Sequence, residues 1–351
     1  MHLSNIQTYC DEINRVAALD LPWSKLAGAT IVLSGASGMI GSFLVDVLMA
    51  RNTNHALDAT VVELARNRDT MAARFSSHAG DNHLVLASAD VTTGPLDLAF
   101  GDYVIHAASN THPVSYAQDP IGTITTNIQG TYNMLDLAKR VAARRAVFVS
   151  TVEIYGQNRV GGEPFKESDL GYIDCNTLRA GYPESKRAGE ALCQAFLAHD
   201  GVDVVIPRLP RVFGPTMRLD DSKAASQFLL RGAAGQDIVL KSAGHQLYSY
   251  CHVADAVGAI LTSLLVGQTG QAYNVADPSG AITLKDLANL VAAAAGVKVV
   301  FDLPDDVESR GFSTATLAVM DGSKLAQLGW MPLYDLADGV AATIGVLRAL
   351  G

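Results

Sequence analysis

The sequence has few cysteines and no arrangement of them that is typical of a metal site or a disulfide framework. Its four cysteines, Cys10, Cys175, Cys193 and Cys251, are scattered over 351 residues, with neither a CxxC pair nor a neighbouring pair of histidines. The nine histidines form no HxH or HExxH motif. Because zinc sites and disulfide frameworks need paired or closely spaced residues, we expect reduced thiols and no metal.

Basic clusters and long apolar runs are also missing. The 26 basic residues are outnumbered by 35 acidic ones and form no run, which argues against a nucleic-acid partner. No apolar stretch reaches the roughly 18 residues that a membrane span needs. The N-terminus, MHLSNIQTYCDEIN, lacks the charged-then-apolar order of a signal peptide. We therefore expect a globular, cytoplasmic enzyme.

What the sequence does contain is an alternation of short apolar runs with helical patterns. The expected strands are TIVLS (30–34), ATVVEL, HLVLAS, DYVIHA, AVFVS and DVVIPR. Strands without polar alternation are buried on both faces, as in a parallel sheet between two layers of helices. The sequence therefore predicts an α/β fold with a Rossmann-type, doubly wound parallel sheet.

After Pro207 the elements become shorter, which predicts a smaller C-terminal α/β substrate lobe. RVFGPTMRLDD is expected to be a loop, DIVL a strand, and SKAASQFLLRGAA, TLKDLANLVAAAAG and YDLADGVAATIGVLRALG helices. We expect an N-terminal helical extension at 1–28, a dinucleotide-binding domain at 29–207 and a substrate-binding lobe at 208–351, with 251–275 returning to the first domain. Apolar spacing within 5–19 predicts a helix, and packing on the core is favoured over a partner surface.

A glycine turn follows the first expected strand. In GASGMIG, missing side chains let the backbone approach a pyrophosphate, while the N–H groups of the following helix face its charge. Asp90 and Val91 follow the third strand, and the small Ala107 and Ala108 follow the fourth. The predicted cofactor-binding residues here are Gly35, Ser37, Gly38, Met39, Ile40, Gly41, Asp90, Val91, Ala107 and Ala108.

The end of the second strand leaves the choice between NAD and NADP open. A carboxylate there hydrogen-bonds the ribose 2′-hydroxyl of NAD, but Glu63 comes slightly early and Arg66 slightly late. NAD is favoured because a retained cofactor fits the chemistry below. Arg66, counted among the cofactor-binding residues, keeps NADP as the alternative.

Tyr182 and Lys186 are the predicted acid/base pair. They are four residues apart in YPESK at the start of a helix, so both side chains project from one face. Oxidising an alcohol requires a base, and tyrosine, with a reference pKa of about 10, needs positive charge nearby to serve as one. Lys186 and a nicotinamide ring can stabilise tyrosinate, and a shift of three units corresponds to about 4 kcal/mol. Both residues would also contact the cofactor.

Hydroxyl and carboxyl groups follow the strand AVFVS, at the edge where open α/β sheets bind ligands. Thr151 can donate to the substrate oxygen, and Glu153 can move a second proton. Ser109, together with Asn110 and Thr111 after the fourth strand, is a candidate for contact with the sugar. Thr151 and Ser109 are therefore predicted to bind substrate.

These motifs resemble the extended short-chain dehydrogenases/reductases of the NAD-dependent epimerase/dehydratase family, and most of all the UDP-glucuronate decarboxylases. The similarity runs from Thr30 through YAQDPIGTITTNIQGTYNMLDLAKRVAAR, STVEIYG and LRAGYPESKRAGE to RLPRVFGP. It implies oxidation at sugar C4 by bound NAD, a change at the neighbouring carbon, and re-reduction of the ketone. It also implies a nucleotide-sugar substrate, a cofactor contact at Asn127 and a homodimer formed through two helices of each subunit.

Several positions depart from the family pattern. Val152 replaces the aspartate with which the 4,6-dehydratases protonate a leaving hydroxyl, so dehydration is disfavoured. Tyr248 replaces a diphosphate-binding arginine, and Arg211 replaces a substrate-binding asparagine. A guanidinium at Arg211 can bind phosphate or carboxylate, or form an ion pair between lobes. The RGFS sequence at 310–313 also departs from the RPGD pattern near the nucleotide base.

These residues are compatible with three functions. The first is a nucleotide-sugar enzyme, either a decarboxylase or a C4 epimerase, with a retained cofactor and no net redox change. The second is an NADP-dependent reductase of a small carbonyl compound, suggested by Arg66 and by the missing arginine at Tyr248. The third is a non-catalytic dinucleotide-sensing protein, against which Tyr182 and Lys186 argue.

Overall fold

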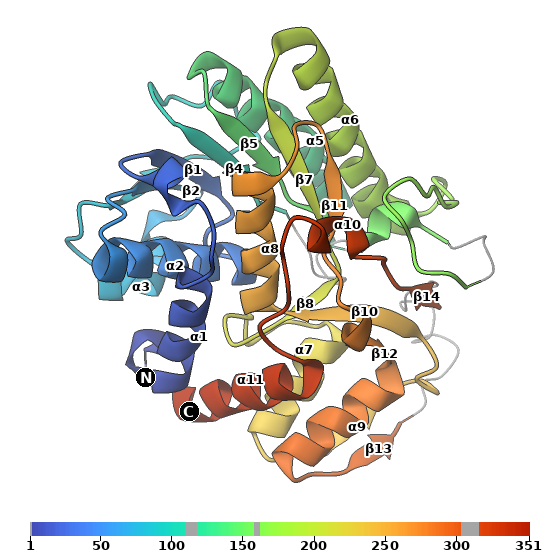
Figure 1. The fold of residues 1–351 in the computed structure, drawn as a ribbon. Coiled ribbons are helices and arrows are strands. Elements are labelled where there is room, and N and C mark those ends of the chain that lie inside the picture. Colours follow the sequence, from blue (N-terminus) through green and yellow to red (C-terminus); the bar gives the residue numbers. More distant parts are fainter. Residues whose placement is uncertain (1, 110–117, 158–161, 303–315) are drawn as a thin grey trace.

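A parallel sheet forms the centre of the protein. The computed structural model describes residues 2–109, 118–157, 162–302 and 316–351; Asn110, Thr111 and residues 310–313 lie outside this part. The strand order is β11-β7-β5-β4-β1-β2-β3, with β6 beside β7, and all pairs are parallel (Figure 1). This confirms the expected α/β fold. The strands are β1 (Thr30–Ser34), β2 (Thr60–Ala65), β3 (Leu84–Ser88), β4 (Tyr103–His106), β5 (Arg145–Phe148), β6 (Ser150–Thr151), β7 (Val204–Leu209) and β11 (Ala272–Asn274).

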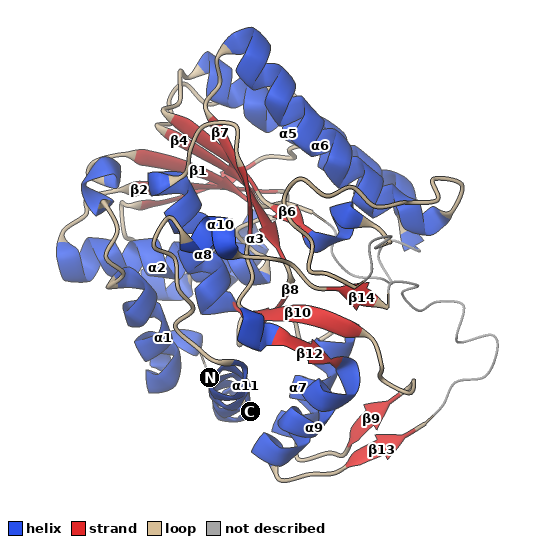
Figure 2. Cartoon of the chain, turned by 45° about the vertical axis from the view of Figure 1, so that its right-hand side comes forward, coloured by secondary structure: helices blue, strands red, loops and turns tan. Residues whose placement is uncertain are grey.

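Helices cover both faces of this sheet (Figure 2). Along β1, Ile31 and Leu33 pack into the core beneath α2 and α8, whereas Val32 packs into the core beneath α5 and α6. Burial on both faces explains why the strands carry no polar alternation. The helices of the two layers are α2 (Met39–His55), α3 (Arg68–Arg74), α5 (Pro120–Arg140), α6 (Gly181–Asp200) and α8 (Val253–Val266).

The chain changes direction across the sheet between β1 and β4. From β1 it continues to β2 and β3 at one edge, and from β4 it continues to β5, β7 and β11 at the other. At such a switch point the loops after the two strands leave on opposite faces and form a crevice where ligands bind. The glycine turn after β1 and Ala107 after β4 both follow the strands at this point.

A smaller lobe lies beyond the carboxyl end of β7 (Figure 1). The expectation of a loop at RVFGPTMRLDD is wrong at its start, because residues 211–213 form β8, which pairs in parallel with β10. Three residues are too few for a recognisable period in the sequence. The lobe contains β8 (Arg211–Phe213), β9 (Ile238–Leu240), β10 (Leu247–His252), β12 (Ala281–Thr283), β13 (Val299–Phe301), β14 (Leu317–Ala318), α7 (Ala224–Ala233), α9 (Leu284–Ala295) and α11 (Leu336–Leu350). A short helix, α10 (Ser323–Ala326), lies near β11.

The N-terminal helix α1 (Gln7–Ala17) packs against α2, α8 and α11. Its apolar residues Ile13 and Val16 join the main core. Tyr9 donates a hydrogen bond of 2.5 Å to Asp46 of α2, and Arg74 of α3 binds the same carboxylate at 2.6 Å. The helix is therefore part of the packed structure. Within the described ranges, no helix is both long enough and apolar enough to cross a bilayer.

Glu12 places a carboxyl group in the interior beneath α1. Its side chain is fully buried, and neither oxygen has a hydrogen-bond partner among the described residues. His252 Nε2 lies 4.0 Å from Oε1. Burial raises the pKa of Glu12 to about 8.

We expect the Glu12→Gln variant to be more stable than the wild type above pH 8 and similar to it near pH 5. The carboxyl group titrates near 4.5 in the unfolded chain and near 8 in the fold, so the fold retains a proton that the unfolded chain releases. The stability linked to this proton is present below pH 4.5 and is lost as the pH rises to about 8, by at most roughly 5 kcal/mol. Urea unfolding from pH 5 to 9 measures the difference.

Asp11→Asn is the matched control, because it removes a carboxylate from the exposed side of the same helix. Its stability should depend on pH as that of the wild type does. Equal pH dependence of Glu12→Gln and the wild type would contradict the buried, protonated carboxyl group.

Candidate active site

The glycine turn brings the loops after β1 and β4 into contact. Gly35 has φ +81°, and a Cβ atom there would lie 2.5 Å from the nitrogen of Ala108 and 2.6 Å from the carbonyl carbon of Ala107. Only glycine fits this position. Gly38 is the N-cap of α2 and provides no side-chain cap, so the first N–H groups of the helix remain available to an anion. This cradle fits the pyrophosphate of a dinucleotide.

The turn also positions the other predicted residues of this segment. Ser37 is exposed, whereas Met39 and Ile40 are partly buried at the start of α2. Gly41 is buried where a Cβ atom would collide with the carbonyl oxygen of Gly35. Met39 is joined to the smaller lobe, because Thr216 Oγ1 donates 2.8 Å to its carbonyl oxygen.

Glu63 and Arg66 differ sharply in their environments. Glu63 lies inside β2, opposite Leu33, and its fully buried carboxyl group has no hydrogen-bond partner among the described residues. Burial raises the pKa of Glu63 to about 8. Arg66 follows β2 and is exposed at the end of the strand. Of the two, only Arg66 is exposed beyond the end of the strand.

Asp90 and Val91 follow β3 in a tight turn. Asp90 Oδ1 accepts hydrogen bonds from the nitrogen of Thr92 at 2.9 Å and from its hydroxyl at 2.7 Å. Burial acts to raise the pKa of Asp90, but the bonds from Thr92 and the charge of Arg66 hold it below its usual value. The carbonyl oxygen of Val91 accepts 2.8 Å from Asn133 of α5. The Asp90 carboxylate is therefore fixed at the sheet edge in its charged form.

Tyr182 and Thr151 come together at the carboxyl end of β6. Tyr182 is buried in the first turn of α6, and Thr151 ends β6. Burial raises the pKa of Tyr182, and the nearby charge of Glu153 raises it further. The hydrogen bond with Thr151 and the charge of Arg179 act in the opposite direction. The lowered tyrosine pKa expected from the sequence is therefore absent in the protein alone.

Lys186 lies one helical turn beyond Tyr182 and is buried. Its Nζ donates 2.9 Å to the carbonyl oxygen of Val149 and lies 4.8 Å from the centre of the Phe148 ring. Burial lowers the pKa of Lys186 to about 8, against the opposing charge of Glu190. At neutral pH most of the ammonium is still protonated.

A chain of hydrogen bonds joins α5 to the first turn of α6. Ser109 Oγ donates 2.7 Å to Asn127 Oδ1, and Asn127 Nδ2 donates 2.9 Å to Ser185 Oγ. Ser185 then donates 2.9 Å to the carbonyl oxygen of Tyr182. Ser109 and Asn127 therefore help to position the first turn of α6, which carries Tyr182. The sequence did not indicate Ser185, because a serine within YPESK has no distinguishing pattern.

The Glu153 carboxylate is partly buried and close to a cation. Arg179 Nη2 lies 3.5 Å from its Oε1, and both side chains retain access to solvent. Its neighbour Val152 is buried in the core of the smaller lobe. Glu153 is thus the carboxylate of this segment that is available for proton transfer.

A buried ion pair, which sequence reasoning missed, supports this region. Arg208 of β7 binds Glu190 of α6 through Nε at 3.0 Å and Nη2 at 2.6 Å. Ser150 Oγ donates 2.5 Å to Glu190, and Arg208 Nη1 donates 2.8 Å to the hydroxyl of Tyr155. A charged residue within the apolar run VVIPRL was the available signal, because arginine is rarely buried unless it is paired.

Arg211 lies on β8 in the smaller lobe. Its guanidinium carbon is 3.4 Å from the centre of the Tyr248 ring, and Nη1 is buried without a hydrogen-bond partner among the described residues. The ion pair between lobes that the sequence allowed is not found within the described part of the chain.

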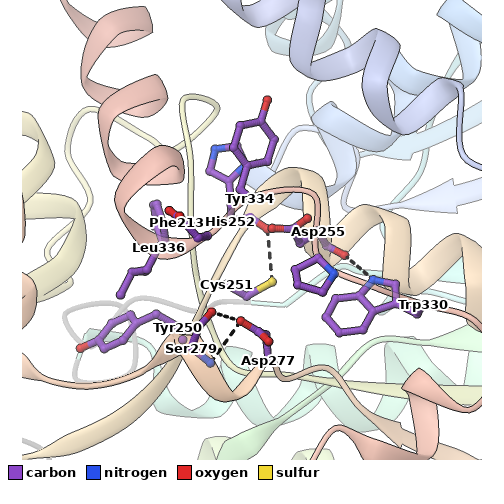
Figure 3. Close-up of a pocket in the computed structure, with 13 residues that line it drawn as sticks. Phe213, Tyr250, Cys251, His252, Asp255, Asp277, Ser279, Trp330, Tyr334 and Leu336 are labelled. Atoms are coloured by element: carbon purple, nitrogen blue, oxygen red, sulfur yellow. Dashed lines mark hydrogen bonds between the residues drawn. The ribbon is translucent and has the colours of Figure 1, made fainter.

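A separate pocket lies beside the start of α8 (Figure 3). Cys251, His252, Asp255 and Tyr334 are among its lining residues, and none of the predicted catalytic residues reaches it. Its volume of about 20 Å³ has room for roughly one water molecule. This pocket is therefore too small for a sugar nucleotide. Among the described residues, no group of His, Cys, Asp and Glu side chains is placed to hold a metal ion.

The strand order and the glycine turn define a doubly wound, dinucleotide-binding α/β protein, with a tyrosine and a lysine on one helix beside the switch point. The chain belongs to the NAD dependent epimerase/dehydratase family, whose model matches residues 31–276. This confirms the family indicated by the sequence.

Similar proteins come from plants, animals and bacteria. UDP-glucuronic acid decarboxylase 3 of Arabidopsis thaliana is 33% identical over 316 residues, covering 88% of this chain and 86% of its own. UDP-glucuronic acid decarboxylase 1 of Xenopus tropicalis is 30% identical, covering 91% of this chain and 72% of its own. UDP-glucuronic acid 4-epimerase of Bacillus cereus, solved with UDP-glucuronic acid and NAD, has a TM-score of 0.77 at 20% identity, covering 92% of this chain and 100% of its own. The last comparison shows the shared fold.

We expect Arg208→Met to lower the free energy of unfolding by about 3–5 kcal/mol, because it leaves Glu190 buried without its cation. Arg218→Met is the matched control, since the Arg218–Asp220 pair is 64% and 69% exposed and should contribute at most about 1 kcal/mol. Chemical denaturation of the three proteins compares them. Equal losses in the two variants would show that burial does not set the strength of the Arg208 pair.

Proposed function

We propose that this protein modifies a nucleotide sugar by oxidising it transiently at C4 with bound NAD and then reducing the ketone again. The observation that carries the proposal is the hydrogen-bonded pair of Tyr182 and Thr151 at the carboxyl end of the sheet. The extent of the similarity to UDP-glucuronic acid decarboxylases supports the substrate class. UDP-glucuronate is accordingly the first substrate to test.

Tyr182 is the proposed base. As tyrosinate it takes the proton of the C4 hydroxyl, and as a phenol it returns a proton when the ketone is reduced. Bound NAD supplies the hydride acceptor and donor at C4, together with a positive charge on the nicotinamide ring. Because burial raises the pKa of Tyr182, tyrosinate depends on positive charge nearby, and Lys186, fixed by its hydrogen bond to Val149, is proposed to contribute it. Thr151 donates to the same substrate oxygen.

Glu153 is proposed to act at C5. Once C4 is a ketone, the C5 carboxylate of a glucuronate is a β-keto acid and leaves as carbon dioxide, its bonding electrons forming an enolate. The carbon at C5 then needs one proton, which Glu153, accessible to solvent, takes up from water and delivers. Arg179 beside Glu153 keeps this carboxyl group oriented. Reduction at C4 completes the cycle with no net redox change.

NAD is the proposed cofactor in preference to NADP, in keeping with the family. Glu63 is enclosed within β2, and we do not assign the ribose contact to it. Arg66 is exposed, and its charge acts on the carboxylate of Asp90. The negative charge of Asp90 would disfavour a 2′-phosphate beside Arg66.

We also propose a homodimer formed through α5 and α6. Ile121, Ile124, Ile128 and Tyr132 form a stripe on α5, and their side chains are 77%, 37%, 37% and 46% exposed. Leu178, just before α6, is 76% exposed. An apolar stripe on a helix pair is favourable for association with a second copy of the same surface.

Tyr182→Phe should lower turnover by several orders of magnitude while the protein still binds NAD. The variant lacks the phenol oxygen that exchanges the proton, but the ring still fills its buried position. The experiment denatures each protein to identify the released dinucleotide. It then incubates each with UDP-, dTDP-, CDP- and GDP-sugars, including UDP-glucuronate, without added reductant.

Carbon dioxide released from UDP-glucuronate by the wild type would support decarboxylation, whereas a C4 epimer would keep the redox cycle and replace the C5 step. Tyr103→Phe is a matched control, since Tyr103 hydrogen-bonds the backbone of Lys25 away from the site. Near-normal turnover by Tyr182→Phe would contradict the mechanism. Stoichiometric NADPH consumption with small carbonyl compounds would favour the reductase instead.

Ile128→Glu should convert the dimer to a monomer, because it places a charge in the middle of the apolar stripe. Analytical ultracentrifugation of the holoenzyme measures the change. Leu219→Glu, at another exposed apolar residue in the smaller lobe, is the control and should leave the mass unchanged. A monomeric wild type would contradict the proposed homodimer.

A further inference from the structure

Arg211 and Tyr248 stand side by side on adjacent strands of the smaller lobe. The register of β8 and β10 places Arg211 opposite Tyr250, two residues along from Tyr248. The guanidinium carbon of Arg211 lies 3.4 Å from the centre of the Tyr248 ring, which is a stacking distance. Tyr248 and Tyr250 have ring centres 6.3 Å apart, so a second ring lies next to the one that the arginine contacts. Such stacking fixes the orientation of a guanidinium.

The guanidinium of Arg211 has a hydrogen-bond donor without an acceptor in the described part of the chain. Nη1 is removed from solvent and has no hydrogen-bond partner among the described residues. An N–H group of a permanent charge is costly to bury unpaired, and an arriving anionic oxygen would recover that cost. Burial raises the pKa of neighbouring Tyr250, and the charge of Arg211 opposes the rise. The positive charge of Arg211 thus acts on Tyr250. In the described part of the chain, Arg211 has no carboxylate partner.

The position of β8 brings Arg211 to the predicted active site. Leu209 of β7 pairs with Thr151, and Arg211 follows Leu209 by two residues. Strands are about 4.8 Å apart and advance about 3.3 Å per residue, so the two Cα atoms lie on the order of 10 Å apart. Further along the same segment, Thr216 bonds the carbonyl oxygen of Met39 at the glycine turn. One nucleotide sugar is therefore long enough to reach from Thr151 to Arg211.

We infer that Arg211, supported by the ring of Tyr248, binds the diphosphate of the nucleotide sugar. The inference rests on the proposed function, because it names the residue that holds its substrate. The two departures from the family pattern then belong together. The positive charge absent at position 248 is supplied from the neighbouring strand, and the tyrosine at 248 is the platform that orients it.

Nucleoside diphosphate binding tests this directly. UDP, dTDP, CDP and GDP are titrated into the NAD-loaded wild type by calorimetry, and the tightest of the four becomes the probe. Arg211→Gln should weaken its binding roughly 10- to 100-fold, as expected for the loss of a charged hydrogen bond. The corresponding nucleoside, which has no phosphate, should bind both proteins equally. Lys298→Gln removes an exposed charge from the same lobe and is the matched control.

Moving the positive charge from position 211 to position 248 distinguishes a binding defect from a folding defect. Arg211→Asn should bind the probe weakly, and adding Tyr248→Arg in that background should restore at least part of the affinity. Tyr248→Phe keeps the ring and should bind like the wild type, whereas Tyr248→Leu should bind several-fold more weakly. Retained NAD and an unchanged Tm in each variant show that the fold persists.

The outcomes distinguish the inference from the proposed function. Wild-type affinity in Arg211→Gln overturns the inference and leaves the function standing. A loss confined to UDP-glucuronate, with UDP binding unchanged, assigns Arg211 to the sugar carboxylate and overturns the diphosphate contact. A wild type that binds none of the four nucleotides and converts no nucleotide sugar overturns the proposed function itself.

Discussion

The buried pair of Arg208 and Glu190 is the interaction on which the candidate site depends. Glu190 lies one turn beyond Lys186 on α6, and Arg208 lies on β7 beside Ser150. Through Ser150 and Tyr155, the pair joins the segment of Thr151 and Glu153 to the helix of Tyr182 and Lys186. Since each charge is buried with the other as its partner, neither segment can shift alone without exposing an unpaired charge. The geometry of the site is therefore fixed by an ion pair that lies outside the proposed catalytic residues.

The sequence predicted those parts of the fold that repeat a pattern over many residues. The central strands are largely apolar and were recognisable, as was the glycine turn, because only glycine fits where Gly35 meets Ala108. β8 could not be recognised, since three residues carry no period and its pairing depends on a strand far away in the sequence. Long-range partners such as Arg208 and Glu190 share this limit. Each residue is visible in the sequence, but the pairing is not.

Electrostatics at the site was the least predictable from the sequence. A tyrosine four residues before a lysine indicates a phenol whose pKa is lowered by the ammonium. The structure adds burial, which acts on the two groups in opposite directions, raising the pKa of Tyr182 and lowering that of Lys186 to about 8. Both shifts favour neutral side chains, as burial always does. In the proposed mechanism the catalytic charge state is therefore created in the complex, when a positive ring and a substrate hydroxyl enter the same desolvated space.

The relation between Arg211 and Tyr248 shows why a missing motif residue is weak evidence of a missing function. In the sequence the two positions are 37 residues apart, and each alone appears as a loss of a binding group. The parallel pairing of β8 with β10 places them in contact, so a charge can move from one strand to the other and still reach the same ligand. A lysine at 211 would be a poor substitute, because its point charge neither stacks on the ring nor offers two parallel donors to a phosphate. The shape of the guanidinium, rather than its charge alone, is what makes the exchange possible.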